Sequence, residues 1–173
     1  TLKRISKFGR DEFYSGETAK KIINYFQKNG GIFTKKDFIN YQSSFKPSIC
    51  STFIDYKVCS MSLPSSGGIV LLQTLNILEN FNLTSYEHNS LEYNRLLTEA
   101  LRFSFADRSE FLGDADFNNF DISRVTSKKY AKSLSKIIKN SESKILINTP
   151  GKYFNESEET THFSIIDSKG NAV

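Results

Sequence analysis

The sequence has few of the cysteine and histidine residues that build zinc sites and no apolar run that could cross a membrane. Its 173 residues contain two cysteines and two histidines, which are Cys50, Cys59, His88 and His162. Their spacing matches no zinc signature. A membrane-spanning helix needs about 20 apolar residues, and the run Ile69–Leu72 is far too short. We therefore expect neither a zinc site nor a membrane span.

The charge pattern is mixed and argues against nucleic-acid binding. Net charge is +4, and adjacent lysines occur only at Lys20-Lys21, Lys35-Lys36 and Lys128-Lys129. Solvated helix faces explain such scattered charge better than a nucleic-acid interface does. With 38% hydrophobic and 24% charged residues, the chain is expected to fold around a real core. Its first residues, Thr1–Arg4, lack a methionine and an apolar signal core, which suggests a processed product or a fragment.

Two helices are predicted in the first part of the chain. The first runs from Gly16-Glu17 to about Lys28, and Gly30-Gly31 ends it because glycine adopts the left-handed cap without strain. Thr34 then begins a short second helix, with Asp37 as its capping-box partner.

A hairpin is predicted next, with strands Ser48–Phe53 and Tyr56–Met61 joined by Ile54-Asp55. This register places Cys50 opposite Cys59 at a position where side chains approach closely, so a disulfide is geometrically possible. Ile-Asp is a poor hairpin turn, however. Two half-buried free thiols remain an equal alternative.

The segment Leu63–Gly68 reads as a tight loop before a helix from Ile69 to Phe81. Exposed backbone N–H groups at such a helix start favour anions, but the lysine and spacing of a phosphate loop are missing. Serine capping, together with glycines that allow close packing, is the favoured interpretation.

A long helix is predicted from Leu91 to about Phe111, capped by Asn89-Ser90. We expect Leu97, Leu101 and Phe105 to form its core stripe. Near its end, Asp107 and Glu110 resemble a catalytic carboxylate pair. Because Arg108 lies between them, we favour an ion-paired network that holds the following turn over a role in acid–base catalysis. A last helix, Ser127 to Asn140, is expected to bury four residues: Tyr130, Leu134, Ile137 and Ile138.

The end of the chain carries the most distinctive chemistry. Residues 141–159 read as a long exposed connection that ends in an acidic stretch. Residues 160–167 then alternate as a half-buried strand, with Thr161, Phe163 and Ile165 on one face, and Ser168–Asn171 supplies a turn. On pattern alone, Thr160 is a β-branched residue suited to a strand.

A second interpretation of Thr160 is catalytic. Cleavage of the Glu159–Thr160 bond would give Thr160 a free α-amine with a pKa of about 7.7–8.0. That amine can take the proton from the hydroxyl of the same residue, as in N-terminal-threonine nucleophiles.

Several separated stretches together resemble the γ-glutamyltranspeptidase (glutathione hydrolase) family. Their order and spacing match the family from near the start of the chain to its end. They are Phe13–Gly16, Asn29–Gly31, Pro64–Ile69, Leu75–Glu79, Ala106–Asp114 and Thr160–Ser164.

The resemblance implies an α+β fold that is part of the αββα sandwich of an N-terminal-nucleophile hydrolase. The part of the sandwich present in this chain would be mostly helical, with a hairpin and a C-terminal strand. Residues 1–159 would be the C-terminal part of the large subunit and residues 160–173 the start of the small subunit. Autocleavage between Glu159 and Thr160 would free Thr160 to attack γ-glutamyl amides. No cofactor is implied, because nucleophile and base belong to one residue.

The resemblance also sets expectations about partners. Substrates would be glutathione or other γ-glutamyl compounds, with water, amino acids or dipeptides as acceptors. The family's oxyanion-hole glycines and its substrate-binding arginine lie outside these 173 residues, so this piece alone is expected to stay uncleaved and inactive. A periplasmic, secreted or surface location is implied and would permit a Cys50–Cys59 bond. The alternative is a non-catalytic helical interaction domain that retains only the scaffold.

Overall fold

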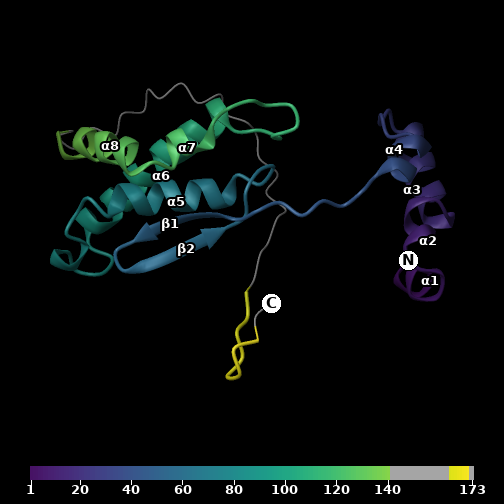
Figure 1. Cartoon of the computed structure of the whole chain (residues 1–173), viewed down its shortest axis with the longest axis horizontal. Coiled ribbons are helices and arrows are strands. Elements are labelled where there is room, and N and C mark those ends of the chain that lie inside the picture. The colour runs from purple at the N-terminus through teal and green to yellow at the C-terminus, as the bar shows by residue number, and fades with distance from the viewer. Residues whose placement is uncertain (141–163, 172–173) are drawn as a thin grey trace. The chain divides into compact units, whose positions relative to one another are not determined.

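A computed structural model describes residues 1–140 and 164–171 of the chain. The chain divides into two compact units, Thr1–Lys46 and Pro47–Val173, which we call unit 1 and unit 2 and describe separately (Figure 1). In the described ranges, none of the helices combines the length and apolar character needed to cross a membrane.

Unit 1 consists of four helices. They are α1 (Leu2–Phe8), α2 (Arg10–Tyr14), α3 (Glu17–Lys28) and α4 (Lys35–Asn40). The predicted bounds of α3 are confirmed, and Gly30 takes a φ of 76° just beyond its end. Thr34 and Asp37 form the predicted capping box at the start of α4. Helices α1 and α2 were not predicted from the sequence.

A charged side chain joins these two unpredicted helices of unit 1 to α3. Glu12 on α2 accepts hydrogen bonds from Arg4 Nε at 2.7 Å and from the Thr18 hydroxyl at 2.9 Å. It also accepts from the backbone N–H groups of Glu17 and Thr18. A carboxylate at a helix start satisfies N–H groups that have no partner within the helix. Glu12 therefore caps α3 from outside that helix.

The described part of unit 2 contains the β1–β2 hairpin and a set of helices. The hairpin is β1 (Ile49–Phe53) and β2 (Tyr56–Ser60), and the helices are α5 (Gly67–Leu78), the short 3₁₀ helix η1 (Leu83–Ser85), α6 (Leu91–Phe111), α7 (Ile122–Val125) and α8 (Lys128–Asn140). The long helix α6 has the predicted bounds. Helix α5 begins two residues earlier than predicted and ends three residues earlier.

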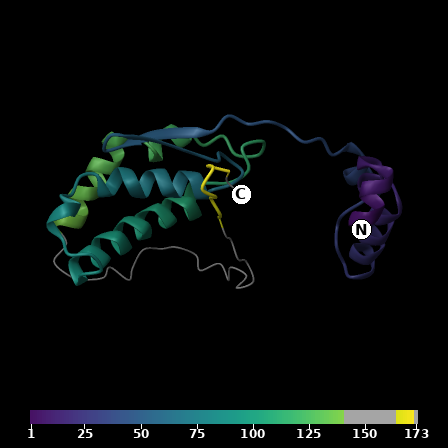
Figure 2. The ribbon, with the colours of Figure 1, turned by 90° about the horizontal axis from the view of Figure 1, so that it is seen from below.

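Helix α5 is the centre of unit 2. The hairpin covers one side of α5, and α6 and α8 pack against other sides of it (Figures 1 and 2). Nine of its twelve residues are buried. A helix surrounded in this way is expected to be apolar around most of its circumference, which explains the run Ile69–Leu72.

Among the described residues of unit 2, buried apolar side chains form two hydrophobic clusters. The larger one joins α5, α6 and α8 through Ile77, Leu96, Ala131, Leu134 and Ile138 and their neighbours. The smaller one forms around Leu63, Ile69 and Val125, where the loop before α5 meets α7.

The predicted core stripe of α6 is confirmed only in part, because Leu97 packs against the larger cluster whereas Phe105 lies at the surface. The residues that α6 buries are Leu96, Glu99, Ala100 and Ser104. Leu97 and Leu101 are only half-buried, and Phe105 is 45% exposed. Small side chains let two helices approach closely, and Ser104 contacts Thr74 of α5 through a 3.0 Å hydrogen bond. The face that meets α5 is therefore small and partly polar.

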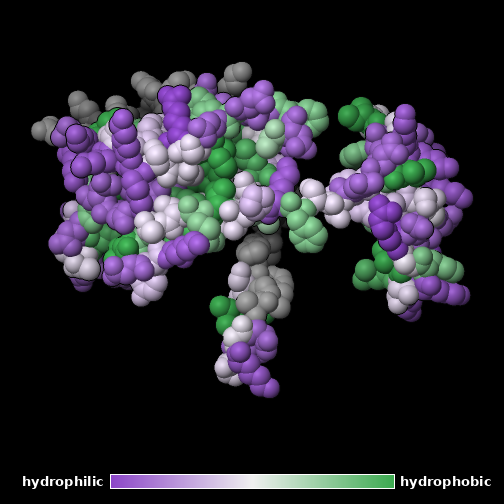
Figure 3. Space-filling view, viewed as in Figure 1, coloured by the Kyte–Doolittle hydropathy of each residue, from purple (hydrophilic) through white to green (hydrophobic). Residues whose placement is uncertain are grey.

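The inward face of α8 also differs from the prediction. Leu134 and Ile138 are buried as expected, together with Ala131 and Ser135. Ile137 is 47% exposed, because it lies beside Ile138 in sequence and so on a different side of the helix. Several large apolar side chains stay on the surface of unit 2, which Figure 3 shows as hydrophobic areas within a mostly hydrophilic face. The exposed apolar residues of its helices include Leu71, Leu91, Phe105 and Ile137.

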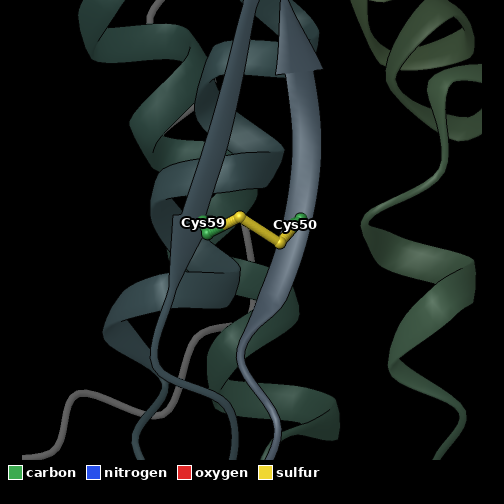
Figure 4. The surroundings of a disulfide bond; sticks show 2 residues. All are labelled: Cys50 and Cys59. Atoms are coloured by element: carbon green, nitrogen blue, oxygen red, sulfur yellow. A yellow bond between two sulfur atoms is a disulfide. The ribbon is translucent and has the colours of Figure 1, made fainter.

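The hairpin has the predicted register. Cys50 pairs with Cys59 across the two strands. Their sulfur atoms form a disulfide bond, which lies across the hairpin (Figure 4). The alternative of two free thiols is therefore wrong. The unfavourable turn residue Ile54 adopts a φ of 54°, which a β-branched residue rarely does.

Candidate functional site

The two residues predicted to carry the chemistry, Glu159 and Thr160, lie outside the described residues. The described part of the predicted strand begins at Ser164 and contains one bridge residue, Ile166. Ile165 is 58% exposed and Ile166 is 74% exposed. These two residues lie on opposite faces of the predicted strand and both are exposed, so the predicted half-buried pattern is wrong at this part of the strand.

The turn predicted after that strand is present. The Asp167 N–H donates to the Asn171 carbonyl at 3.0 Å, and the Gly170 N–H donates to the Asp167 carbonyl at 3.1 Å. Gly170 has a φ of 81°. Together these features define a β-turn over residues 167–170, followed by a glycine bulge that brings Asn171 opposite Asp167.

The Asp167 carboxylate stabilises this turn from within. It accepts from the backbone N–H groups of Lys169 and Asn171, each at 2.9 Å, and from the Asn171 side-chain amide at 2.7 Å. These hydrogen bonds, led by that from the Asn171 side chain, lower the pKa of Asp167 below its usual value. The charged form of Asp167 is therefore the form that holds the turn.

The loop before α5 is the second candidate region, because it contains the Ser-Ser-Gly-Gly sequence. Ser66 occupies the N-cap position, but its side chain makes no capping hydrogen bond. Its hydroxyl instead accepts from Arg108 Nε of α6 at 2.9 Å. The expected serine capping is therefore wrong, whereas the expected close packing of glycine is confirmed. A Cβ on Gly68 would lie 2.1 Å from the Met61 carbonyl oxygen.

Asp107 of α6 is the centre of the third candidate region, where it joins three helices. It accepts a 2.5 Å hydrogen bond from Gln73 Nε2 of α5 and a 3.2 Å hydrogen bond from the Tyr130 hydroxyl of α8. Burial and the nearby Asp107 charge raise the pKa of Tyr130 to about 12. Both donors are uncharged, and Glu110 is exposed at the surface. Asp107 thus links helices of the scaffold, whereas the following turn is held by Asn118, which donates to the Phe111 carbonyl at 2.8 Å.

A polar face of α5 was not predicted from the sequence. Gln73, Thr74 and Asn76 are all buried within an otherwise apolar helix. Asn76 accepts from Ser51 of the hairpin at 2.9 Å and donates to the Thr126 carbonyl at 2.7 Å. The sequence signal for this face was the presence of three polar residues within the otherwise apolar segment Ile69–Leu78. In a buried helix such side chains need hydrogen-bond partners on neighbouring elements.

No metal centre is formed by the part of the chain that the structure describes. Across residues 1–140 and 164–171, no three His, Cys, Asp or Glu side chains converge as metal ligands would.

Comparison with known proteins identifies relatives along the whole length of the chain. The family model described as gamma-glutamyltranspeptidase matches residues 1–173. The chain is 42% identical over 175 residues to the glutathione hydrolase proenzyme of Escherichia coli strain K12, covering 100% of this chain and 30% of that protein. It is also 32% identical over 173 residues to the acylase ACY 1 proenzyme of Pseudomonas sp. strain SE83, covering 100% of this chain and 31% of that protein.

A solved structure agrees with these sequence relatives. The gamma-glutamyltranspeptidase of Helicobacter pylori superposes with a TM-score of 0.73 at 37% identity, covering 79% of this chain and 39% of that one. The chain thus spans about a third of the length of the curated relatives it matches. The shared fold and the match over residues 1–173 show that this chain belongs to the gamma-glutamyltranspeptidase family.

Proposed function

We propose that the full-length protein that contains this chain is a γ-glutamyltransferase and glutathione hydrolase whose nucleophile is Thr160. The family match over residues 1–173, which includes the Thr160-Thr161-His162 sequence, is the observation that carries this proposal. The 42% identity to a protein named as a glutathione hydrolase proenzyme supports both the substrate class and synthesis as a precursor.

The proposed maturation step uses the same hydroxyl that later performs catalysis. The Thr160 hydroxyl attacks the carbonyl of Glu159, and the peptide nitrogen leaves as the Thr160 α-amine. The resulting ester between Glu159 and Thr160 is hydrolysed by water, which leaves a free carboxylate on Glu159. Thr160 then begins a new chain and carries both a nucleophile and an amine that can accept its proton.

The proposed catalytic cycle repeats this chemistry on the substrate. The hydroxyl of Thr160 attacks the γ-glutamyl amide carbonyl, and the α-amine takes the hydroxyl proton and passes a proton to the leaving amine. A γ-glutamyl ester on Thr160 results. Water or the amine of an amino acid or dipeptide then attacks this ester and releases the glutamyl product. No cofactor enters either step.

The proposal also assigns the residues of this chain to two subunits. Residues 1–159 contribute to the large subunit and residues 160–173 begin the small subunit, and the remaining parts of both subunits are partners. The 173-residue polypeptide made by itself is expected to remain uncleaved, because the oxyanion donors that polarise the Glu159 carbonyl belong to those other parts. A periplasmic, secreted or surface location is supported by the Cys50–Cys59 disulfide, since such bonds persist in oxidising compartments.

The test compares two substitutions at Thr160 in the full-length protein. Thr160→Ala removes the hydroxyl, whereas Thr160→Ser keeps it and serves as the matched control. We expect Thr160→Ala to remain a single chain by intact mass and to release no amine from a γ-glutamyl anilide. Thr160→Ser is expected to yield two chains, one of which begins at residue 160. Cleavage and turnover in Thr160→Ala at the wild-type rate would overturn the proposal.

The acylase relative favours a second candidate function. Its name indicates hydrolysis of an acyl amide by a proenzyme of the same family. A panel that pairs γ-glutamyl anilide with anilides of other acyl groups separates the two activities. Preference for another acyl group would retain Thr160 as nucleophile but change the substrate class. Complete inactivity of a cleaved, folded protein on the panel would favour the non-catalytic interaction domain.

A further inference from the structure

The Cys50–Cys59 disulfide lies on the face of the hairpin opposite to α5. Side chains alternate between the two faces of a strand. Ser51 and Val58, which neighbour the cysteines in sequence, are half-buried, and Ser51 donates a hydrogen bond to Asn76 of α5. Cys50 and Cys59 point to the other side and are both exposed. A thiol in solution can therefore approach the two sulfurs.

A positive charge lies beside these sulfurs. Lys57 pairs with Thr52 in the hairpin, two residues along each strand from the Cys50–Cys59 pair. Alternation puts Lys57 on the same face as both cysteines, and a diagonal neighbour at this spacing is about 7–8 Å away, within reach of a long side chain. The other charged residue of the hairpin is Asp55, which lies in the turn. The face that carries the disulfide therefore favours the approach of a negatively charged thiol.

The hairpin keeps its register through contacts other than the disulfide. The Ile54 N–H donates to Glu79 of α5 at 3.0 Å, and Lys128 of α8 donates to the Thr52 carbonyl. Together with the side-chain hydrogen bond between β1 and α5, these contacts fix the turn and one strand to the helices. The two sulfurs are therefore expected to stay opposite each other after the bond between them breaks, so that the bond can form again without refolding.

We propose that the Cys50–Cys59 disulfide is a thiol-exchange site for glutathione and similar anionic thiols, and that Lys57 favours these thiols over cationic ones. The choice of glutathione rests on the proposed function, because a glutathione hydrolase meets this thiol as its substrate. Glutathione carries two carboxylates and one ammonium group, so its thiolate form has a net charge of −2 at neutral pH. This charge is complementary to that of Lys57.

The exchange breaks one disulfide and forms another. The thiolate of glutathione attacks one of the two cysteine sulfurs, the bond between the cysteines breaks, and the other cysteine leaves as a thiolate. A mixed disulfide between the protein and glutathione results. A second glutathione thiolate attacks the glutathione sulfur of this mixed disulfide, which releases glutathione disulfide and leaves both cysteines reduced. Two glutathione molecules thus supply the two electrons. In the reverse direction, the free cysteine of the mixed disulfide attacks its partner and expels glutathione.

The first experiment measures whether the disulfide reacts in the folded protein. Full-length Thr160→Ala is used, so that the proposed activity does not consume glutathione. The protein is incubated with glutathione in buffer or in urea and quenched with an alkylating reagent, and intact mass then counts bound glutathione and alkylated thiols. Because access limits exchange, we expect the folded protein to react within about tenfold of the rate in urea. A disulfide that reacts only in urea would overturn the proposal.

The second experiment tests Lys57 with two thiols of different charge. In cysteamine an ammonium group offsets the thiolate charge, so the ratio of the glutathione rate to the cysteamine rate isolates the electrostatic effect. Lys57→Gln is expected to lower this ratio about threefold, whereas Lys57→Arg should leave it unchanged. Lys136→Gln is the matched control, because Lys136 is exposed on α8, about 12 Å along the helix from Lys128. An unchanged ratio in Lys57→Gln would overturn the selectivity for anionic thiols.

The outcomes separate this inference from the proposed function. If the folded protein exchanges with glutathione but wild-type enzyme releases no amine from γ-glutamyl anilides, the exchange site stands and the proposed function is wrong. If the enzyme is active but its disulfide stays unreactive until the protein is unfolded, the function stands and the exchange site is wrong.

Discussion

Cys50 and Cys59 face each other directly across the β1–β2 hairpin and are joined by a disulfide, with their Cα atoms 4.1 Å apart. Both residues are exposed. The opposite face of the hairpin is fastened to α5 by the Ser51–Asn76 hydrogen bond. The hairpin is therefore held on one side by a covalent bond and on the other by contacts with the helix.

Removal of the disulfide is expected to lower stability without unfolding unit 2. A crosslink across nine residues of sequence constrains the unfolded chain by at most about 3 kcal/mol. The double substitution Cys50→Ser, Cys59→Ser should therefore lower the melting temperature and leave the circular dichroism spectrum unchanged. Dithiothreitol should lower the wild-type melting temperature by the same amount and leave that of the double variant unaltered. A loss of helical signal at room temperature would contradict this account.

The adjacent glycines at the start of α5 are expected to respond oppositely to alanine. A Cβ on Gly68 would meet the Met61 carbonyl oxygen at 2.1 Å, whereas a Cβ on Gly67 would lie 3.7 Å from the nearest atom, the Ser65 hydroxyl. Because overpacking against backbone forces shifts, Gly68→Ala should destabilise the protein by about 1–3 kcal/mol. Gly67→Ala should be neutral or slightly stabilising, since alanine favours the helix. Urea unfolding of both variants measures the difference, and equal midpoints would refute it.

Glu79 is expected to make a pH-dependent contribution to stability. It accepts from Lys128 and from the Ile54 N–H at 3.0 Å, which ties the hairpin turn to α5 and α8. Partial burial acts to raise the pKa of Glu79, but these hydrogen bonds outweigh it and bring the pKa below its usual value. A lowered pKa means that the stabilisation is present above the unfolded value and is lost as the pH falls through the folded one.

Glu79→Gln should therefore cost about 1 kcal/mol at pH 7, and the difference from wild type should vanish as the pH falls through the lowered pKa of folded Glu79. Glu87→Gln, at an exposed position, is the control and should leave stability unchanged at both pH values. Urea unfolding midpoints at several pH values provide the measurement. A difference for Glu79→Gln that persists unchanged at pH 3 would argue against this role of the carboxylate.

Tyr130 is expected to ionise only at strongly alkaline pH. Its pKa is raised to about 12 by burial and by Asp107, so its stabilising effect is complete below pH 10 and is lost as the pH rises towards 12. In an absorbance titration at alkaline pH, the step at about pH 12 should disappear in Tyr130→Phe and remain in Tyr56→Phe, a variant of a 73% exposed tyrosine. Tyr130→Phe should also cost about 1–3 kcal/mol, because the charged Asp107 carboxylate loses the hydrogen bond that the Tyr130 hydroxyl donates. Unchanged stability would show that the contact is dispensable.

Local sequence was sufficient wherever the determining residues lie close together in the chain. Thr34 and Asp37 form a capping box within one turn of helix, and Gly30 ends α3 one residue beyond its cap. The Cys50–Cys59 pairing followed from the length of the hairpin, even though Ile54 is an unfavourable turn residue. A turn was likewise predicted at Ser168–Asn171 from its turn-forming residues, and the observed turn begins one residue earlier, at Asp167. Helices α1 and α2 were not predicted, because they are joined to α3 by the contacts of Glu12. The pattern of apolar residues does not reveal such polar contacts.

The family, the main helices and the hairpin register could be predicted from the sequence, since each depends on motifs or on residues near one another in the chain. Which side of α6 is buried depends instead on tertiary packing, because it is set by how closely α5 can approach. Ala100 and Ser104 permit that approach, while the larger Phe105 is directed to the surface. The tertiary structure likewise gave Asp107 its partners, since Gln73 and Tyr130 meet it from two helices that are distant in the sequence.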